Sequence, residues 1–293
     1  MTTAIIARVF AVVLCSLAAL PALAQDKVLP EGSTLAGILE RGTLRVGLEA
    51  GYMPFEMLDK RGGLRERDLR PADVRKGGQQ VSLIGFDIDI AREMAKALGV
   101  KFVPINTRWQ SIIPALNVGR FDIIISGMSV TEARKQKVDF ADPYMTIGQT
   151  ILLAKTHEGT VTSHLDLNDP KFTVTSKPGT TGEEAVQRIL PNATYKPFDT
   201  EVEAATEVLE GRADAFVYDL PYTTAFYAMQ GGRNLVLLDE PFTTEPLAWA
   251  IRKGDPDFLK WLNSFLAEIR QDGRYDAIHA RWFGSTDWFK YVN

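Results

Sequence analysis

The amino-acid sequence predicts an α/β protein of two lobes, each a mainly parallel sheet flanked by helices, joined by a two-strand hinge. Short β-branched runs such as residues 121–125 are typical of strands buried on both faces of a parallel sheet. These runs alternate with helical segments, which implies right-handed crossovers between parallel strands. Residues 115–124 (ALNVGRFDII) are echoed by residues 208–216 (VLEGRADAF), since in both a helix ends at a glycine and a strand follows an aspartate. With 293 residues, the chain is long enough for two such units with separate cores.

The N-terminus predicts export. Residues 5–20 form an apolar run with Arg8 near its start, and small residues precede a cleavage site after Ala24. The run is shorter than a membrane span and a polar segment follows it. We therefore expect residues 1–24 to be a signal peptide and the mature protein to be soluble in the periplasm. The single cysteine, Cys15, lies in this leader, so the mature chain has no disulfide.

Composition excludes several function classes. The formal net charge is −4, and it becomes −5 when Arg8 leaves with the signal peptide, which makes nucleic acid an improbable partner. The three histidines His157, His164 and His279 are scattered and match no common zinc spacing, so we expect surface histidines and no metal site. No Gly-x-Ser-x-Gly elbow of a serine hydrolase is present. We expect no cofactor.

The first lobe is predicted to begin with a helix over residues 34–41, capped by Ser33 and ended by Gly42, before a strand over 43–48. Residues 59–82 form an insert in which positions 60–76 carry seven basic and three acidic side chains. Its glycines and proline favour a solvated loop between two strands, with a contact for an anionic partner or a transporter as the alternative.

A helix ending at Gly99 and a strand over 101–105 follow the insert. The next helix contains Pro114, which is tolerable only if it lies in the first turn, and Trp109 should sit just before that helix.

A candidate anion site follows the predicted strand 121–125. The strand leads into a small polar loop, Ser126 to Ser129, and Thr131 then offers an N-cap for a helix that carries Arg134. In open α/β sheets, ligands bind beyond the carboxyl ends of the strands. Hydroxyl groups, free N–H groups at a helix start and an arginine would gather there.

The second lobe is predicted to lie between two strands. The strand over 147–154 leaves the first lobe, and the strand over 247–252 returns to it. Within it, strand 172–175 leads into a turn that holds Thr180 and Thr181 at a helix N-terminus. The strand over 213–218 ends at Asp219, which would face the cleft or, alternatively, cap the helix begun by Pro221.

Two C-terminal helices complete the chain, the first capped by Asp255 and running to 271, the second over 273–283. We expect the lobes to comprise residues 31–145 together with 245–293, and residues 146–244.

Several motifs taken together resemble a known family. They are Trp109 with Ile113-Pro-Ala-Leu116, Gly119-x-Phe-Asp122, Ser126-x-x-Ser129-x-Thr-x-x-Arg134 and Phe140-x-x-Pro-Tyr144. This pattern is similar to the extracytoplasmic solute-binding proteins of family 3, which serve ATP-driven uptake of polar amino acids. The resemblance extends over residues 33–284 except for the insert, and it implies a two-lobed periplasmic-binding-protein fold.

The resemblance implies a ligand stacked on Tyr52, with Trp109 as a second covering aromatic. The alternative for Tyr52 is a core aromatic at the hinge side. We expect Arg134 to bind a ligand carboxylate, with backbone N–H groups of Ser129 and Thr181 completing its shell. Asp219 would pair with the ammonium group.

Further contacts are expected from the Ser126 hydroxyl and the Gly127 carbonyl, and Thr180 lies in the same turn as Thr181. Many family members have a hydroxyl residue where this chain has Gly127. The sequence does not choose among basic, acidic and amide ligand side chains.

The function implied is a monomeric periplasmic receptor that delivers an amino acid to the membrane permease of an ABC transporter. The main rival is an enzyme, because periplasmic cyclohexadienyl dehydratases share the fold and much of the motif. Their general acid is a glutamate three residues after the position of Asp219, where this chain has Tyr222. No other cleft-lining acid is suggested by the sequence.

Overall fold

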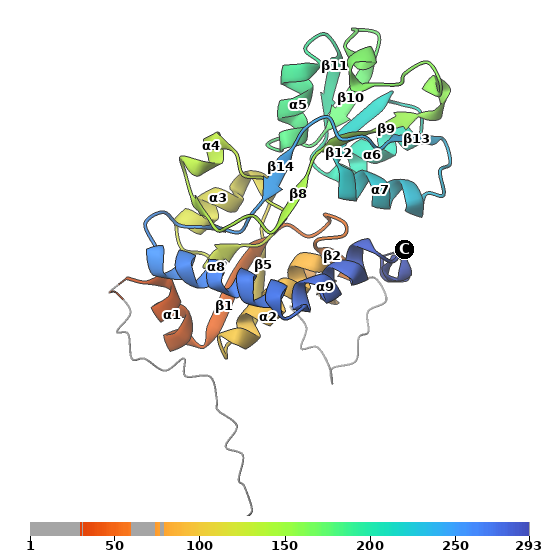
Figure 1. Ribbon diagram of the computed structural model, residues 1–293. Coiled ribbons are helices and arrows are strands. Elements are labelled where there is room, and N and C mark those ends of the chain that lie inside the picture. The colour runs from red at the N-terminus through yellow and green to blue at the C-terminus, as the bar shows by residue number, and fades with distance from the viewer. Residues whose placement is uncertain (1–29, 31, 60–73, 77–78, 293) are drawn as a thin grey trace, which may run out of the picture.

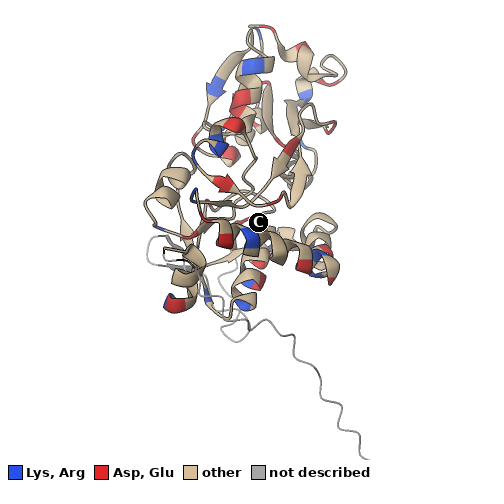
Figure 2. Ribbon diagram, turned by 60° about the vertical axis from the view of Figure 1, so that its left-hand side comes forward, with Lys and Arg blue, Asp and Glu red and all other residues tan. Residues whose placement is uncertain are grey.

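The computed structural model describes residues 30, 32–59, 74–76 and 79–292 of the chain. The predicted signal peptide and most of the predicted insert lie outside these residues. The described chain forms two lobes, each built around its own sheet, with a narrow crossing between them (Figure 1). Acidic and basic residues are spread over both lobes rather than segregated (Figure 2).

The first lobe contains a five-stranded sheet in which β5, β1 and β6 are parallel and β15 is antiparallel to β6 and β7. Its strands, in spatial order, are β5 (Lys101–Asn106), β1 (Thr43–Leu48), β6 (Ile123–Ile124), β15 (Ala250–Ile251) and β7 (Asp139–Phe140). A side sheet consists of β2 (Met57–Asp59), β4 (Gln79–Ile84) and β3 (Val74–Lys76).

Helices cover both faces of this sheet. Successive side chains of a strand point to opposite faces, so Ile123 packs into the cluster that holds Met94 and Leu262, whereas Ile124 packs with Ile112 and Leu116. The helices of this lobe are α1 (Thr34–Arg41), α2 (Phe86–Ala97), α3 (Trp109–Asn117), α4 (Glu132–Lys135), α8 (Pro256–Gln271) and α9 (Arg274–Phe283), followed by the 3-10 turn η3 (Asp287–Tyr291).

The second lobe repeats the plan, with β11, β10 and β12 parallel and β9 antiparallel to β12 and β13. The strands are β11 (Thr194–Pro197), β10 (Thr173–Ser176), β12 (Ala215–Asp219), β9 (Gln149–Ala154) and β13 (Leu235–Leu238). The helical segments are η1 (Lys155–His157), η2 (His164–Leu167), α5 (Thr181–Ile189), α6 (Glu201–Leu209) and α7 (Leu220–Met229). Ile151 packs with residues of α5 and Leu152 with residues of α6, so this sheet is also covered on both faces.

The hinge is a two-stranded antiparallel pair, but its strands end earlier than predicted. β8 (Met145–Ile147) pairs with β14 (Glu245–Leu247), while β9 and β15 belong to the sheets of the two lobes. Gly148 separates β8 from β9, and a Cβ there would lie 2.1 Å from the Thr243 carbonyl oxygen. This close backbone approach, which only glycine allows, is a tertiary contact that the apolar pattern of 147–154 does not reveal.

The prediction for Pro114 is wrong. Helix α3 begins at Trp109 itself, so Pro114 is its sixth residue and lies beyond the first turn. Its ring removes the bond that the Gln110 carbonyl would accept. Gln110 is exposed, so that carbonyl can bond to water instead.

Helix ends follow the predicted signals in part. The Ser33 hydroxyl accepts a hydrogen bond from the Ala36 N–H at 3.2 Å, and Gly42 adopts a left-handed φ of 66°, as predicted. Asp255 does precede α8, but its carboxylate accepts from the Thr34 N–H at 3.1 Å and does not cap its own helix.

Within the insert, the prediction of a solvated loop is wrong for residues 74–76, which form β3 and pair antiparallel with β4.

Candidate ligand-binding site

The loop after β6 is built as the sequence predicts. Thr131 is extended, and its hydroxyl accepts from the Arg134 N–H at 3.2 Å, which caps α4. The cap fixes the first turn of this short helix, which carries Arg134. Ser126 and Ser129 lie on the same loop, and both are buried.

A cavity between the lobes is lined by all of the residues predicted for the site. The predicted residues that line it are Tyr52, Trp109, Ser126, Gly127, Ser129, Arg134, Thr180, Thr181 and Asp219. Four lining residues were not predicted, and they are Glu49, Glu56, Lys177 and Tyr218.

Arg134 is a buried cation that lacks an acidic partner. Its side chain donates to the Ser129 carbonyl at 2.8 Å and to the Gly179 carbonyl at 3.2 Å. Its guanidinium carbon lies 5.2 Å from the centre of the Trp109 ring. Within the described residues, no carboxylate lies within 4.0 Å of it, and burial lowers its pKa. A guanidinium has five N–H donors, so a ligand carboxylate can still be bound.

Asp219 is a buried acid that lacks a cationic partner. It ends β12 and precedes α7, yet its side chain makes no capping bond, so the capping alternative is wrong. Its carboxylate accepts instead from the Tyr52 hydroxyl and from the Gln149 amide. Burial, together with the nearby carboxyl of Glu245, raises the pKa of Asp219 to about 7. A positively charged ligand group beside Asp219 would stabilise its carboxylate form and lower this pKa.

The two charges come from opposite lobes. Arg134 follows β6 of the first lobe and Asp219 follows β12 of the second. Each influences the pKa of the other in the direction expected of opposite charges, although they form no ion pair. A molecule that carries one carboxylate and one ammonium group would pair both charges at once.

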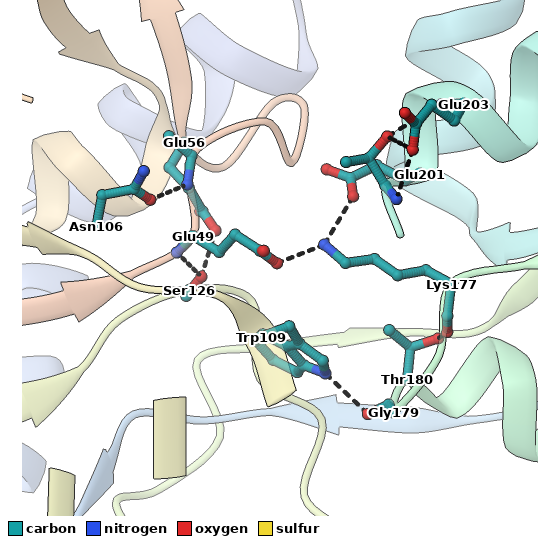
Figure 3. Close-up of polar contacts among 12 residues, drawn as sticks. Glu49, Glu56, Asn106, Trp109, Ser126, Lys177, Gly179, Thr180, Glu201 and Glu203 are labelled. Carbon is teal, nitrogen blue, oxygen red and sulfur yellow. Dashed lines mark hydrogen bonds and ion pairs between the residues drawn. The ribbon is translucent and has the colours of Figure 1, made fainter. Parts of the chain in front are cut away.

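The other end of the cavity holds an ion-paired cluster. Lys177 extends between Glu49 of the first lobe and Glu201 of the second, and the Lys177–Glu201 distance is 2.8 Å (Figure 3). Burial alone would lower the pKa of Lys177, but Glu201 and Glu49 outweigh it and raise that pKa. Glu49 follows β1 and Lys177 follows β10, so the strand-end rule that predicted Asp219 also points to these residues.

Glu56 is an acid of the cavity that the sequence did not suggest. Its side chain is fully buried and accepts from the Ser126 hydroxyl. Burial and the carboxyl of Asp87 raise the pKa of Glu56 well above its usual range. With Glu49 and Glu56 in the lining, the expectation of no cleft-lining acid other than Asp219 is wrong.

Gly127 is required by the packing of Tyr52. Its φ is +50°, and a Cβ there would lie 2.2 Å from Cε1 of Tyr52. Its N–H donates to the Asp87 carboxylate at 2.7 Å. A hydroxyl residue at this position therefore cannot coexist with the Tyr52 ring in its present place, which is why glycine stands here.

The two aromatic residues both line the cavity, and Tyr52 also packs in the core. Tyr52 stacks on Phe55 with ring centres 4.7 Å apart, as a core residue would, and also lines the cavity. Trp109 is half-buried and donates from Nε1 to the Gly179 carbonyl at 2.8 Å, which joins the lobes (Figure 3).

Two predicted hydroxyl groups are already engaged within the protein. The Ser126 hydroxyl donates to Glu56 and accepts from the Glu49 N–H at 3.1 Å, which leaves one lone pair. The Thr180 hydroxyl donates to the Lys177 carbonyl at 2.7 Å and caps α5.

The histidines are less exposed than predicted. All three are half-buried: His157 bonds to Asp214 at 2.7 Å, while His164 stacks on Phe242 and His279 on Phe283. None of them lines the cavity. Across the described residues, no cluster of three or more His, Cys, Asp or Glu side chains is suited to hold a metal ion. Nor does any helix in the described part of the chain have the length and apolar character needed to cross a membrane.

Comparisons with known proteins agree on one family. Residues 66–285 match the family described as bacterial extracellular solute-binding proteins, family 3. The chain is 30% identical over 248 residues to the L-cystine-binding protein TcyJ of Escherichia coli K12, covering 85% of each chain. It is 26% identical over 267 residues to the cyclohexadienyl dehydratase of Pseudomonas aeruginosa, covering 91% of this chain and 92% of the dehydratase.

Among solved structures, a similar one is the putative binding component of an ABC transporter from Wolinella succinogenes, complexed with lysine. It is 48% identical with a TM-score of 0.76, and the alignment covers 85% of this chain and 99% of that protein.

Proposed function

The chain belongs to the bacterial extracellular solute-binding proteins of family 3, and we propose that it is the amino-acid-binding component of an ABC uptake system. What supports this function most directly is the pair of buried, oppositely charged side chains Arg134 and Asp219. They line one cavity, and among the described residues neither is within 4.0 Å of an opposite charge. An amino acid carries the two charges that complement them.

The α-carboxylate of the ligand binds to Arg134 and to the N–H groups of Ser129 and Thr181 at the helix N-terminus. The ammonium group binds to Asp219 and to the Gly127 carbonyl. Because the two lobes supply the two charges, only the closed cleft pairs both, so ligand stabilises closure by differential contacts. Tyr52 and Trp109 cover the ligand between them.

A cationic side chain is the class that we propose for the ligand. The Wolinella protein, which is 48% identical, is complexed with lysine. Glu49, Glu56 and Lys177 line the cavity, and Lys177 pairs with Glu49 and with Glu201, which lies beside them, so three acids are accompanied by one cation. This excess of carboxyl groups favours a ligand that brings a second positive charge.

The mature receptor acts in the periplasm as a monomer, after cleavage behind Ala24, and a membrane permease recognises its closed form. The moving bodies are residues 31–145 with 245–293, and residues 146–244.

Binding without catalysis is the activity we propose, with a dehydratase as the alternative. The dehydratase relative is less similar than the lysine complex, at 26% against 48% identity. Tyr222, at the position of the dehydratase acid, is fully buried and lies outside the cavity lining. The presence of Glu56 in the cavity lining favours the alternative, because an acid whose pKa is raised by burial is suited to donate a proton.

Titration calorimetry of the mature chain, from Gln25 onward and refolded to strip carried-over ligand, tests the proposal. The panel is the common L-amino acids, then dicarboxylates, then cyclohexadienyl acids with product detection. Tight binding of L-lysine or L-arginine without turnover is the expected result. Formation of an aromatic product would make the protein an enzyme, and no binding of any amino acid would reject the receptor function.

A further inference from the structure

The far end of the cavity contains two acids in different situations. Glu49 is matched by Lys177, which also pairs with Glu201. Glu56, by contrast, has no cation within 4.0 Å in the described part of the chain. The two acids both line the cavity, so a ligand that enters it meets one neutralised carboxylate and one carboxyl group that lacks a counter-charge.

One oxygen of Glu56 has no hydrogen-bond partner. Glu56 directly precedes β2, and the Ser126 hydroxyl donates a hydrogen bond to its Oε1. Oε2 is inaccessible to solvent and is bonded to nothing among the described residues. A buried polar atom left without a partner is costly, so a ligand group that bonds to Oε2 would remove that cost.

Charges nearby determine what Glu56 can accept. The acids that raise its pKa are Asp87, Glu201 and Glu49, in that order after burial itself, and Tyr144 also lies close enough to interact with it. The nearby cation, Lys177, is already held by Glu49 and Glu201. An anionic or neutral group brought to Glu56 would leave this excess of acids uncompensated, whereas an ammonium or guanidinium group would compensate it.

We propose that Glu56 is a specificity-determining residue, whose carboxylate binds the cationic side-chain group of the ligand at its unpartnered oxygen. This inference rests on the proposed function, because it assumes that the α-carboxylate and α-ammonium groups occupy Arg134 and Asp219. Glu49 and Lys177 then hold the lobes together, and Glu56 distinguishes a basic amino acid from its neutral counterpart.

Binding of a cation at Glu56 releases a proton. Burial and the neighbouring acids raise the pKa of Glu56 and so favour its neutral form, whereas the ion pair with the ligand requires the carboxylate. Asp219 also loses protons when any α-ammonium group binds, since its pKa is about 7. The difference in proton release between L-lysine and L-glutamine at one pH therefore reports on Glu56, because the contribution of Asp219 is common to both.

Calorimetry on Glu56→Gln tests the affinity. We expect L-lysine to bind about 100-fold more weakly to this variant, while any affinity for L-glutamine stays within about threefold. Glu40→Gln, on the exposed face of α1, is the matched control and should bind L-lysine as the unmodified protein does. Equal L-lysine affinity in Glu56→Gln and in the unmodified protein would overturn the inference.

Proton release, measured in two buffers of different ionisation enthalpy, tests the same inference without a variant. We expect more protons to be released with L-lysine than with L-glutamine, and we expect Glu56→Gln to remove the difference. Equal release by the two ligands in the unmodified protein would overturn the role of Glu56. Failure of the unmodified protein to bind any amino acid would instead reject the proposed function, so the two failures are distinguishable.

Discussion

The two ends of the cavity differ in whether their charged side chains are paired within the protein. At the zwitterion end, defined by Arg134 and Asp219, the opposite charges come from different lobes and stay apart. At the side-chain end, defined by Glu49, Glu56, Lys177 and Glu201, a lysine of the protein already pairs with two of the three acids. The charges that the protein leaves unpaired are therefore the ones available to a ligand, and the paired charges connect the lobes.

This difference predicts that one end of the cavity determines the affinity for the ligand, while the other end stabilises the closed arrangement of the two lobes. A buried charge that gains its first partner from a ligand contributes to binding free energy. A charge that is already paired contributes to the closed arrangement with or without ligand. Substitutions at the zwitterion end should weaken binding, while substitutions of the paired cluster should mainly lower stability.

The largest effect is expected for Arg134→Ala, which removes the cation of the zwitterion end. Binding of the amino acid should weaken by roughly 2–5 kcal/mol, because its carboxylate would be buried without a partner. Arg134→Lys keeps the charge but loses the planar fork, and an intermediate loss is expected. Calorimetry measures both, and unchanged affinity in the alanine variant would remove Arg134 as the anchor.

Lys177→Met tests the paired cluster. Removal of the Lys177 ammonium group leaves the Glu49 and Glu201 carboxylates without their shared cation, so the free energy of unfolding should fall by about 2 kcal/mol. That is less than the loss expected for a fully buried pair, because the Glu49 side chain is 19% exposed. Lys171→Met, at a lysine whose side chain is 67% exposed, is the control and should change stability little. Denaturant unfolding gives the comparison, and equal stability of the two variants would contradict the role of Lys177.

A lower pH should raise the stability of the protein without ligand and lower its affinity for an amino acid. Burial raises the pKa of Asp219 from 3.8 to about 7, so the empty folded state takes up a proton that the unfolded chain does not. Its contribution to stability is therefore larger at pH 5 than at pH 8, by about 1.4 kcal/mol for each pH unit between the two pKa values. Amino-acid affinity should instead fall below pH 7, because the ammonium group needs the carboxylate.

Unfolding and binding curves at several pH values measure this contrast. Asp219→Asn, which cannot titrate at this position, should lose the part of each pH dependence that Asp219 supplies. If the variant kept the full pH dependence of binding, another group would have to be responsible.

Local chemistry explains why much of the site could be predicted from the sequence. Thr131 caps α4 and Thr180 caps α5 through bonds that span three residues, so short patterns placed Arg134 and Thr181 correctly. Asp219 was found because it follows a strand. The parallel sheets then bring these strand ends to one cavity without further information.

Long-range contacts explain what the sequence did not reveal. The register of the hinge depends on the contact between Gly148 and Thr243, nearly a hundred positions apart along the chain. The pairing of Lys177 with Glu49 exists only when the lobes face each other. Gln149, whose amide contacts Thr181, Asp219 and Glu245, looks like an ordinary strand residue until the fold is known.

The most direct test of the difference between the two ends is a comparison of L-lysine with 6-aminohexanoate, which keeps the carboxylate and the terminal ammonium but lacks the α-amino group. In the unmodified protein, calorimetry should show L-lysine bound more tightly by about 2 kcal/mol, because only L-lysine pairs with Asp219. In Asp219→Asn that preference should disappear. Equal affinity for the two ligands in the unmodified protein, or a preference that survives in Asp219→Asn, would contradict the assignment of Asp219 to the α-ammonium group.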